Sequence, residues 1–423
     1  MPIILACFSA LFFYYVNSNI EEFRNWPNLK YKSGDSTTYL DAGNWLIGKA
    51  EFHEVKQSVA IRPFFYPLIV ALLEAAHPWA VLVYQFILWE LQILIVYFCG
   101  ILISRSAVTS FVLSLFCVSI LSPIGISLHV LAETTSSFLL VISLFFLIYY
   151  ATCGSSIFLF FYLFALSLCS VVKPLYFYIF IFNSLLGLFF WRKKNIVGTL
   201  LFLLIMVPIS FQLYIMKNNF NINNISFVDT LAVNDYFLCR LELYKRRIEK
   251  EENSMKIIKT IRDARRNAIV KLIDRYGYRE TGIVVSKEFN ENMRTYPYDT
   301  LRLFIDLVIE NSKQSSSFLP AKTYLREKRF FFISLWQSDF LRTINILSLL
   351  IFLSICFYFK SHAHRKYIIV NISLFFSVYA TYIANGITFW QGDRFIIPIY
   401  FISAIWFFIQ INTILDIISV YKK

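Results

Sequence analysis

The sequence has little charge for its length, because only 16% of its 423 residues are Asp, Glu, Lys or Arg, whereas 58% are hydrophobic and 19% are aromatic. So apolar a chain cannot form the hydrated surface of a soluble protein, and that class is excluded. Runs that approach the roughly 20 apolar residues needed to cross a bilayer recur along it. Only helices suit runs of this length, so the composition predicts an all-α, multi-pass integral membrane protein.

Cysteine is also used sparingly. The seven cysteines form no CxxC pair and show no zinc spacing. Six of them fall within apolar runs, and only Cys239 lies in a polar segment, so no disulfide is expected to hold that segment together. The first apolar run lacks the positively charged start of a signal peptide and is interpreted as a span.

Ten spanning helices are predicted from the apolar runs. They cover 2–16, 79–103, 107–122, 131–151, 156–172, 174–191, 196–216, 339–359, 367–388 and 395–417. The chain then divides into an N-terminal transmembrane module, 1–216, a polar insertion, 217–338, and closing helices, 339–423. Within the first module, the apolar stretch 64–76 is too short to span and predicts a helix at the membrane surface.

The short basic loops predict the orientation, because Lys and Arg favour the cytoplasmic side. In the ten-span arrangement these loops share one side: Arg105, Arg192–Lys194, Lys360–Lys366 and Lys422–Lys423. The loop 18–62, the surface helix and the insertion then face the extracytoplasmic side. The predicted location is the plasma (inner) membrane with a site facing outward.

The net charge of +13 raises the question of nucleic acid. Of the 40 Lys and Arg residues, 22 lie in 217–338 beside 15 acids. On an extracytoplasmic face, anionic membrane lipid or a pyrophosphate-linked substrate is the better partner, so no nucleic acid is expected. Helical spacing of apolar residues within 255–276 and 298–308 predicts two helices that rest on the membrane or on the core.

Asp35 and Arg62 are the first candidate reactive groups. Asp35, in the sequence Gly-Asp-Ser-Thr-Thr-Tyr, could take a proton from an acceptor, or it could cap a helix running through Tyr39 and Trp45. Arg62 precedes Pro63, so its backbone should be extended. Its guanidinium could bind a phosphate, or its stem could lie along the interface with the charge in water.

Other ionisable residues mark the ends of spans. Glu133 begins one span, where a helix N-terminus favours an anion, while Lys173 and Arg394 lie at outer span ends and could neutralise phosphate or simply mark the membrane edge. Glu90 falls in mid-span beside Gln92 and faces the bundle, in a structural role or in proton movement.

The order of these motifs resembles the GT-C membrane glycosyltransferases, especially bacterial relatives of the protein O-mannosyltransferases and the lipid A aminoarabinose transferase. The residues that carry the resemblance are Gly34-Asp35-Ser36 with Tyr39, Gly48, Arg62-Pro63, Tyr66-Pro67, Leu131-Ala132-Glu133, Lys173-Pro174 and Arg394 to Pro398. It covers 1–216 and 339–417, and only loosely 217–338. The family usually has Pro where Ala132 stands and Arg where Lys173 stands.

The resemblance implies transfer of a sugar from a polyprenyl-phosphate donor to a lipid, glycan or protein acceptor. Asp35 would be the catalytic base, and Arg62, Lys173 and Arg394 would contact the donor phosphate. The cavity would be lined by Tyr39, Asp41, Tyr66 and Glu133. Asp35 and Asp41 could also hold Mg²⁺ or Mn²⁺, although nothing in the sequence requires a metal.

Two alternatives stay open at this point. One is a polysaccharide polymerase with similar hydropathy. The other is a flippase or transporter of lipid-linked glycan, which would explain the spans and Glu90. A transporter should show paired halves with broken helices, and the sequence has no such symmetry.

Overall fold

The computed structural model describes residues 1–18, 34–190, 196–245, 254–313, 328–358, 368–385 and 396–421. Throughout these ranges the regular elements are helices, and no strand occurs among them. The predicted all-α class is therefore confirmed for the part of the chain that the structure describes.

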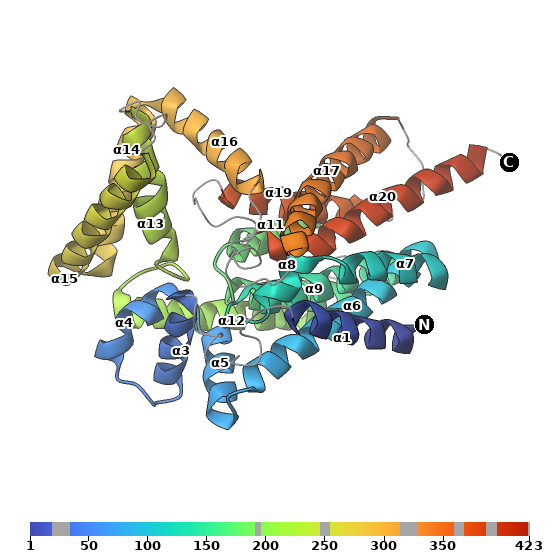
Figure 1. The fold of residues 1–423 in the computed structure, drawn as a ribbon, viewed down its shortest axis with the longest axis horizontal. Coiled ribbons are helices and arrows are strands. Elements are labelled where there is room, and N and C mark those ends of the chain that lie inside the picture. Colours follow the sequence, from blue (N-terminus) through green and yellow to red (C-terminus); the bar gives the residue numbers. More distant parts are fainter. Residues whose placement is uncertain are drawn as a thin grey trace.

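A bundle of apolar helices forms most of the molecule (Figure 1). Its members are α1 (Pro2–Ser18), α6 (Ala80–Ser104), α7 (Ala107–Val118), α9 (Glu133–Cys153), α10 (Ser156–Ser170), α11 (Tyr176–Phe190), α12 (Ile196–Phe220), α17 (Lys328–Tyr358), α19 (Ile368–Asn385) and α20 (Tyr400–Tyr421). Each predicted span overlaps one of these helices. The short α8 (Leu121–Ile126) connects α7 to α9.

Four helical stretches are long and apolar enough to cross a membrane: Ala80–Ser104, Glu133–Cys153, Leu200–Phe220 and Ile397–Ser419. Six further apolar helical stretches of the described chain have 10–17 residues, fewer than the roughly 20 that a perpendicular crossing needs. The four long stretches support a membrane protein. The ten-span topology and its orientation stay predictions.

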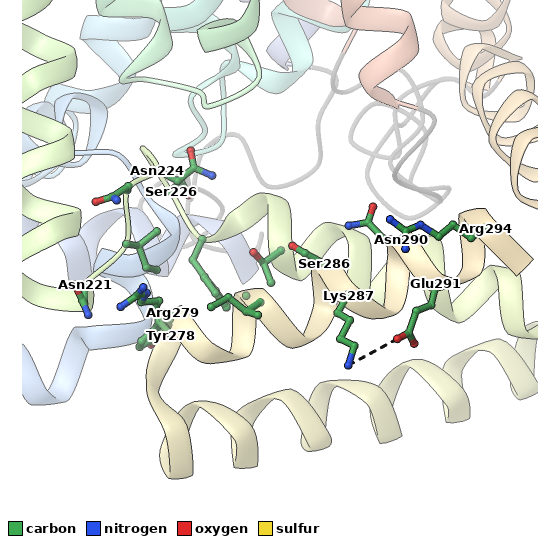
Figure 2. A pocket seen from close by; sticks show the side chains of 16 residues that line it. Asn221, Asn224, Ser226, Tyr278, Arg279, Ser286, Lys287, Asn290, Glu291 and Arg294 are labelled. Carbon is green, nitrogen blue, oxygen red and sulfur yellow. Dashed lines mark ion pairs between the residues drawn. The ribbon is translucent and has the colours of Figure 1, made fainter. Parts of the chain in front are cut away.

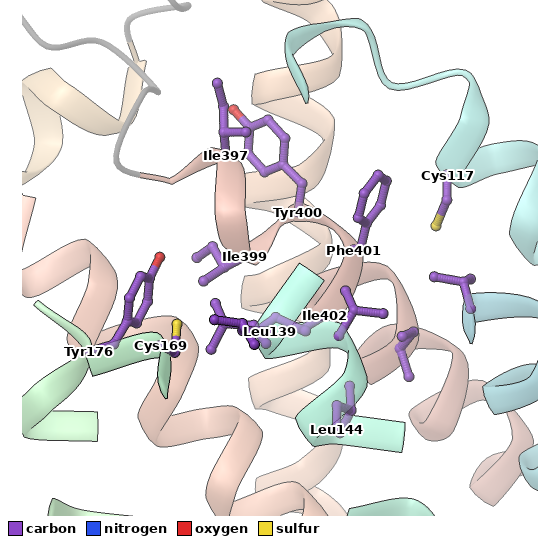
Figure 3. Close-up of a cluster of buried hydrophobic side chains, with 14 of the residues drawn as sticks. Cys117, Leu139, Leu144, Cys169, Tyr176, Ile397, Ile399, Tyr400, Phe401 and Ile402 are labelled. Atoms are coloured by element: carbon purple, nitrogen blue, oxygen red, sulfur yellow. The ribbon is translucent and has the colours of Figure 1, made fainter. Parts of the chain in front are cut away.

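The bundle core is closed by the start of α20 and the preceding 3₁₀ turn η4 (Ile397–Ile399). Figure 3 shows Ile399, Phe401 and Ile402 beside Leu139 and Leu144 of α9. All five side chains are at most 7% exposed. The aliphatic side chains of α9 therefore hold the last long helix in place.

The predicted outer loop 18–62 contains two helices, α3 (Gly34–Leu46) and α4 (Phe52–Ile61), which pack against each other. The predicted surface helix is present as α5 (Phe65–Ala76) and packs against both α3 and α6. In Figure 1 these three helices lie at the end of the bundle away from both chain termini.

The insertion has a hydrophobic core of its own. Its elements are α13 (Val228–Ala232), the π-helical turn η2 (Val233–Leu238), α14 (Cys239–Lys245), α15 (Ser254–Thr295) and α16 (Pro297–Lys313). The two predicted helices are confirmed within α15 and α16. Their apolar faces bury Ile269, Leu303 and Leu307 against Phe237 and Leu241. Both helices also contact the bundle, α15 at α12 and α16 at α17 and α19, so the predicted contact with the core is present, while contact with the membrane stays a prediction.

The helix α15 is a hairpin, which the sequence did not predict. Gly277 has φ 81° and ψ 174°, a region of backbone space that essentially only glycine enters, and it interrupts the helix. Arg265 donates to Glu288 at 2.8 Å across the hairpin. In a straight helix residues 23 apart would lie about 35 Å from each other, so this contact requires the second half to run back along the first.

The helix α17, which contains the predicted span 339–359, begins at Lys328, within the predicted insertion. The sequence also predicts that the Ser-rich stretch 315–317 ends the second helix of the insertion and leads back toward the bilayer. This stretch lies outside the described residues.

Candidate active site

Asp35 and Arg62 form an ion pair at the end of the bundle that carries α3, α4 and α5. Nη2 of Arg62 donates to Oδ1 of Asp35 over 2.6 Å. Asp35 lies in the first turn of α3, where the helix dipole favours a negative charge. The helix expected from the capping alternative does exist, and it runs through Tyr39 and Trp45. The carboxylate nevertheless reaches across to Arg62, and at 37% exposure it is accessible to solvent.

Arg62 is fixed on several sides. Its backbone is extended, with φ −111° and ψ 112°, as its place before Pro63 predicts. Nε donates to Oγ1 of Thr38 at 2.8 Å and Nη1 donates to the hydroxyl of Tyr39 at 3.2 Å. The guanidinium also lies 4.3 Å from the centre of the Tyr39 ring, a cation–π contact. With its side chain 11% exposed, Arg62 is held in the site and differs from a solvated interfacial arginine.

Tyr66 supports this pair by packing against Tyr39. Its ring is wholly buried and packs edge-on against Tyr39, with centroids 5.0 Å apart. Nε2 of Gln85 donates to the Tyr66 hydroxyl at 3.1 Å and to the carbonyl of His129 at 2.9 Å. Burial raises the pKa of Tyr66 well above its usual value, and the charge of Glu133 raises it further. Tyr66 therefore stays neutral and links the Asp35 pair to the start of α9.

Glu133 and Lys173 form the second ion pair. Glu133 is the first residue of α9 and Lys173 lies in the turn between α10 and α11, as predicted for both. Nζ of Lys173 donates to Oε1 of Glu133 at 3.2 Å, and the two side chains are 9% and 1% exposed. A buried charge needs a partner, and each residue supplies the other's. The sequence predicted separate roles for these residues, whereas the structure joins them.

The remaining predicted residues lie in different surroundings. Asp41 accepts a hydrogen bond from Ser58 at 3.3 Å. Six residues apart on α3, Asp35 and Asp41 project about 120° apart around the helix axis, which does not favour a shared metal. No group of three His, Cys, Asp or Glu residues suited to a metal occurs among the described residues. Arg394 lies outside the described residues, which resume at Ile396, just before η4 packs on α9.

The insertion holds the backbone on which Arg62 stands, a feature that sequence reasoning missed. The Phe227 amide donates to the Ala60 carbonyl at 2.8 Å, and the Ser226 hydroxyl donates to the Ile61 carbonyl at 2.9 Å. These contacts occupy carbonyls in the last turn of α4, where a helix leaves them without internal partners.

Gln212 of α12, a bundle helix, connects the residues after Arg62 to the start of the insertion by hydrogen bonds. Its Oε1 accepts from the Phe64 amide at 3.0 Å, and its Nε2 donates to the Ile225 carbonyl at 2.7 Å. Gln212 is 1% exposed, so its amide is devoted to this link. A buried glutamine in an apolar helix was the available signal, but the sequence does not show which backbone groups it binds.

Tyr236 of the insertion also belongs to the surroundings of Asp35. Burial raises the pKa of Tyr236, and the negative charge of Asp35 raises it further, while Arg262 and Arg266 act in the opposite direction. Asp35 is therefore near enough to act on Tyr236 electrostatically. Tyr236 lies in η2, and π-helical turns often occur at functional sites.

Together these groups place a solvent-accessible carboxylate beside a fixed guanidinium, with a buried ion pair further into the bundle. Such a set can accept a proton at one point and stabilise negative charge at another. Comparison with protein-family models, curated proteins and solved structures gives no match to this chain.

Proposed function

We propose that this chain is an integral membrane glycosyltransferase of the GT-C type. It moves a hexose or pentose from a polyprenyl-phosphate carrier to a lipid, glycan or protein acceptor, in the assembly or modification of cell-surface glycan. The observation that best supports this proposal is the Asp35–Arg62 ion pair, which joins an accessible carboxylate to a fixed cation. The proposal also rests on the motif resemblance described above.

In the proposed reaction, an acceptor oxygen or nitrogen attacks the anomeric carbon from the side opposite the leaving phosphate. The new glycosidic bond forms as the bond from carbon to phosphate oxygen breaks, and the phosphate leaves with the electron pair, so the configuration inverts. Asp35 takes the proton of the acceptor. Arg62 orients that carboxylate through its 2.6 Å contact.

The cations stabilise the charge that develops on the leaving phosphate. Arg62 pairs directly with the base, whereas Lys173 pairs with Glu133 at the start of α9. Arg394, the third proposed cation, lies outside the described residues. Lysine offers a point charge in place of the planar fork of arginine, so Lys173 would contribute charge with less geometric selection.

The membrane setting follows from the donor. A polyprenyl chain cannot leave the bilayer, so a polar acceptor has to be brought to the membrane surface. The helices α3 to α5 and the insertion project from the end of the bundle away from both termini (Figure 1), an arrangement that suits a single outward-facing site. The proposed location is the inner membrane with this end extracytoplasmic.

The test separates an enzyme from a transporter. Purified protein in nanodiscs is given a polyprenyl-phosphate donor labelled in the sugar, together with candidate acceptors, and loss of label from the lipid is measured. A parallel experiment in liposomes measures movement of the intact lipid across the bilayer. We expect acceptor-dependent cleavage. Movement of intact donor without cleavage would overturn the proposal in favour of a flippase.

A further inference from the structure

A groove lined by both polar and apolar side chains lies along one side of the insertion, apart from the Asp35–Arg62 pair. It has a volume of about 620 Å³ and lies between the second half of α15 and the segment 221–230. Figure 2 shows the side chains of this groove spread along α15 from Tyr278 to Arg294. None of the residues that the sequence marked as candidates lines it.

The helical wall of the groove is one continuous face of α15. Its lining residues recur every three or four positions from Arg279 through Gly282, Ser286 and Asn290 to Arg294, the period of an α-helix. That stretch is about 22 Å long at 1.5 Å per residue. Gly282 and Ser286 have small side chains, so the middle of this wall does not protrude into the groove. The groove is therefore long enough to hold an extended chain.

The facing wall is rich in amides and hydroxyls. Asn221, Asn223, Asn224, Ser226 and Thr230 line it, and Asn290 adds an amide from α15. Amides and hydroxyls both donate and accept hydrogen bonds, as the hydroxyls of a sugar require. Tyr278 closes one end of the groove, where its ring is 6% exposed and packs against Phe220 and Phe227. With Ile222 and Ile283 also in the lining, the mixture of polar and apolar groups suits the hydroxyls and apolar ring faces of a carbohydrate.

The groove also carries positive charge. Three cations, Arg279, Lys287 and Arg294, line it beside one carboxylate, Glu291. Lys287 and Glu291 form a pair at 3.9 Å with both side chains mostly exposed, so this contact is weak. Arg279 and Arg294 stand at the two ends of the lining stretch (Figure 2). Planar guanidinium groups bind carboxylate and phosphate well, so the ends favour an anionic ligand.

The groove is joined to the candidate active site through backbone contacts. Ser226 and Phe227 line the groove, and the same two residues bind the carbonyls of Ile61 and Ala60, directly before Arg62. A ligand bound in the groove is thus held by the segment that positions the catalytic pair.

We propose that this groove binds the acceptor as an anionic glycan chain, one whose sugars carry carboxylate or phosphate groups. This inference rests on the proposed function, since it names the acceptor class of that reaction. The amides of the groove and the hydroxyls of Thr230 and Ser286 bind sugar hydroxyls, while Arg279 and Arg294 bind acidic groups several sugars apart.

The test measures binding to the full-length protein in detergent by microscale thermophoresis. The probes are hexagalacturonate, which carries carboxylates, a glycerol phosphate oligomer, which carries phosphates, and neutral maltohexaose. We expect an acidic probe to bind about tenfold or more tightly than maltohexaose, since hydrogen bonds to charged groups contribute about 1.5–3 kcal/mol. The acidic probe that binds more tightly shows whether the groove prefers sugars that carry carboxylate groups or sugars that carry phosphate groups. Equal binding of all three, or of none, would overturn the inference.

Matched variants locate the binding. Arg279→Gln and Arg294→Gln should each weaken the acidic probe several-fold, whereas Arg275→Gln removes the same charge from α15 outside the groove and should have no effect. In Gly282→Ala the added Cβ meets its nearest atoms at 3.8 Å and should leave binding intact, while Gly282→Trp should block the groove. If phosphatidylglycerol nanodiscs abolished glycan binding, the groove would be a lipid site instead.

The two proposals can fail separately. Asp35 does not line the groove, so Asp35→Asn should bind the acidic probe normally. If the probe bound as expected while Asp35→Asn transferred sugar at the normal rate, the assigned catalytic role would fail and the groove would stand. If Asp35→Asn abolished transfer while Arg279→Gln and Arg294→Gln changed neither probe binding nor transfer, the groove assignment alone would fail.

Discussion

The carboxylate of Asp35 and the guanidinium of Arg62 lie 2.6 Å apart although 27 residues separate them in the sequence. Thr38 and Tyr39, one turn along α3 from Asp35, bind the same guanidinium. A single turn of helix thus fixes both the candidate base and its cation. The pair is built by α3 and the end of α4, two helices that pack against each other.

Asp35→Asn should separate catalysis from structure. Asparagine has nearly the same shape and can still accept a hydrogen bond from Arg62, but it cannot take a proton at neutral pH. We expect sugar transfer to fall about 10²–10⁴-fold, the usual contribution of a general base. Transfer from a purified polyprenyl-phosphate donor measures this effect.

Asp41→Asn is the matched control, because Asp41 lies on the same helix and its described partner is Ser58. It should change transfer much less than Asp35→Asn does. Near-normal transfer by Asp35→Asn, with thermal stability unchanged, would leave Asp35 a structural partner of Arg62.

Apolar patterning predicted the helices of the bundle well, because burial in lipid or in a core imposes the same long runs on the sequence. The extended backbone at Arg62 was also predictable, since Pro63 restricts its neighbour sterically. Glu133 at the start of α9 and Lys173 in a turn followed from the positions where the apolar runs end. These features depend on local sequence.

Features set by tertiary pairing were not predictable in the same way. Nothing local shows that Gln212 binds the Phe64 amide, or that Lys173 meets Glu133 across 40 residues. The Gly277 hairpin was missed because an isolated glycine in a helical pattern is compatible with either a straight helix or a break. Tyr236 was missed because the effect of Asp35 on its pKa depends on how the insertion packs.

The hairpin predicts opposite effects at two glycines of α15. Gly277 has a positive φ that other residues adopt only with strain, so Gly277→Ala should destabilise the protein by about 1–3 kcal/mol. Gly282 lies in regular helix with room for a methyl group, so Gly282→Ala should stabilise it by about 0.5–1 kcal/mol. Thermal unfolding in detergent tests both. Equal stability of the two variants would contradict the hairpin.

The proposed topology predicts which positions a membrane-impermeant thiol reagent can reach. In a background without native cysteines, Glu51→Cys and Lys287→Cys should be labelled from outside intact cells, since both native side chains are more than 75% exposed. Lys193→Cys and His362→Cys lie in basic loops assigned to the cytoplasm and should be labelled only after lysis. Labelling of either pair from the opposite side would contradict the proposed orientation of the chain in the membrane.

Asp229 predicts a pH dependence of stability. Burial raises its pKa from 3.8 to about 6, although a hydrogen bond with Asn224 opposes the shift. Because the folded pKa is above the unfolded value, Asp229 binds its proton more tightly in the folded state. The contribution of this bound proton to the free energy of unfolding is therefore complete below pH 3.8 and is lost as the pH rises to about 6.

The comparison of Asp229→Asn with the native protein isolates this effect. The melting temperature of the variant relative to the native protein should rise between pH 4 and pH 6 and then level off. Asp263→Asn removes a surface carboxylate and serves as the control for loss of one charge. A difference that does not change with pH would show that Asp229 does not carry the dependence.

The buried pair of Glu133 and Lys173 makes the last prediction. Lys173→Gln would leave the carboxylate of Glu133, 1% exposed, without the ammonium at 3.2 Å. Removing one partner of a buried pair typically costs about 3–5 kcal/mol, so this variant should unfold more easily whatever its role in catalysis. Loss of transfer in Lys173→Gln alone would therefore not identify a phosphate-binding residue.

The double variant Glu133→Gln with Lys173→Gln resolves this ambiguity. Two neutral amides can hydrogen-bond to each other, so its thermal stability in detergent should return toward that of the native protein. If Lys173 acts on the donor phosphate, the double variant should still transfer sugar slowly, whereas Lys173→Arg, which keeps the charge, should retain more transfer than either glutamine variant. A stable double variant with normal transfer would assign the pair a structural role only.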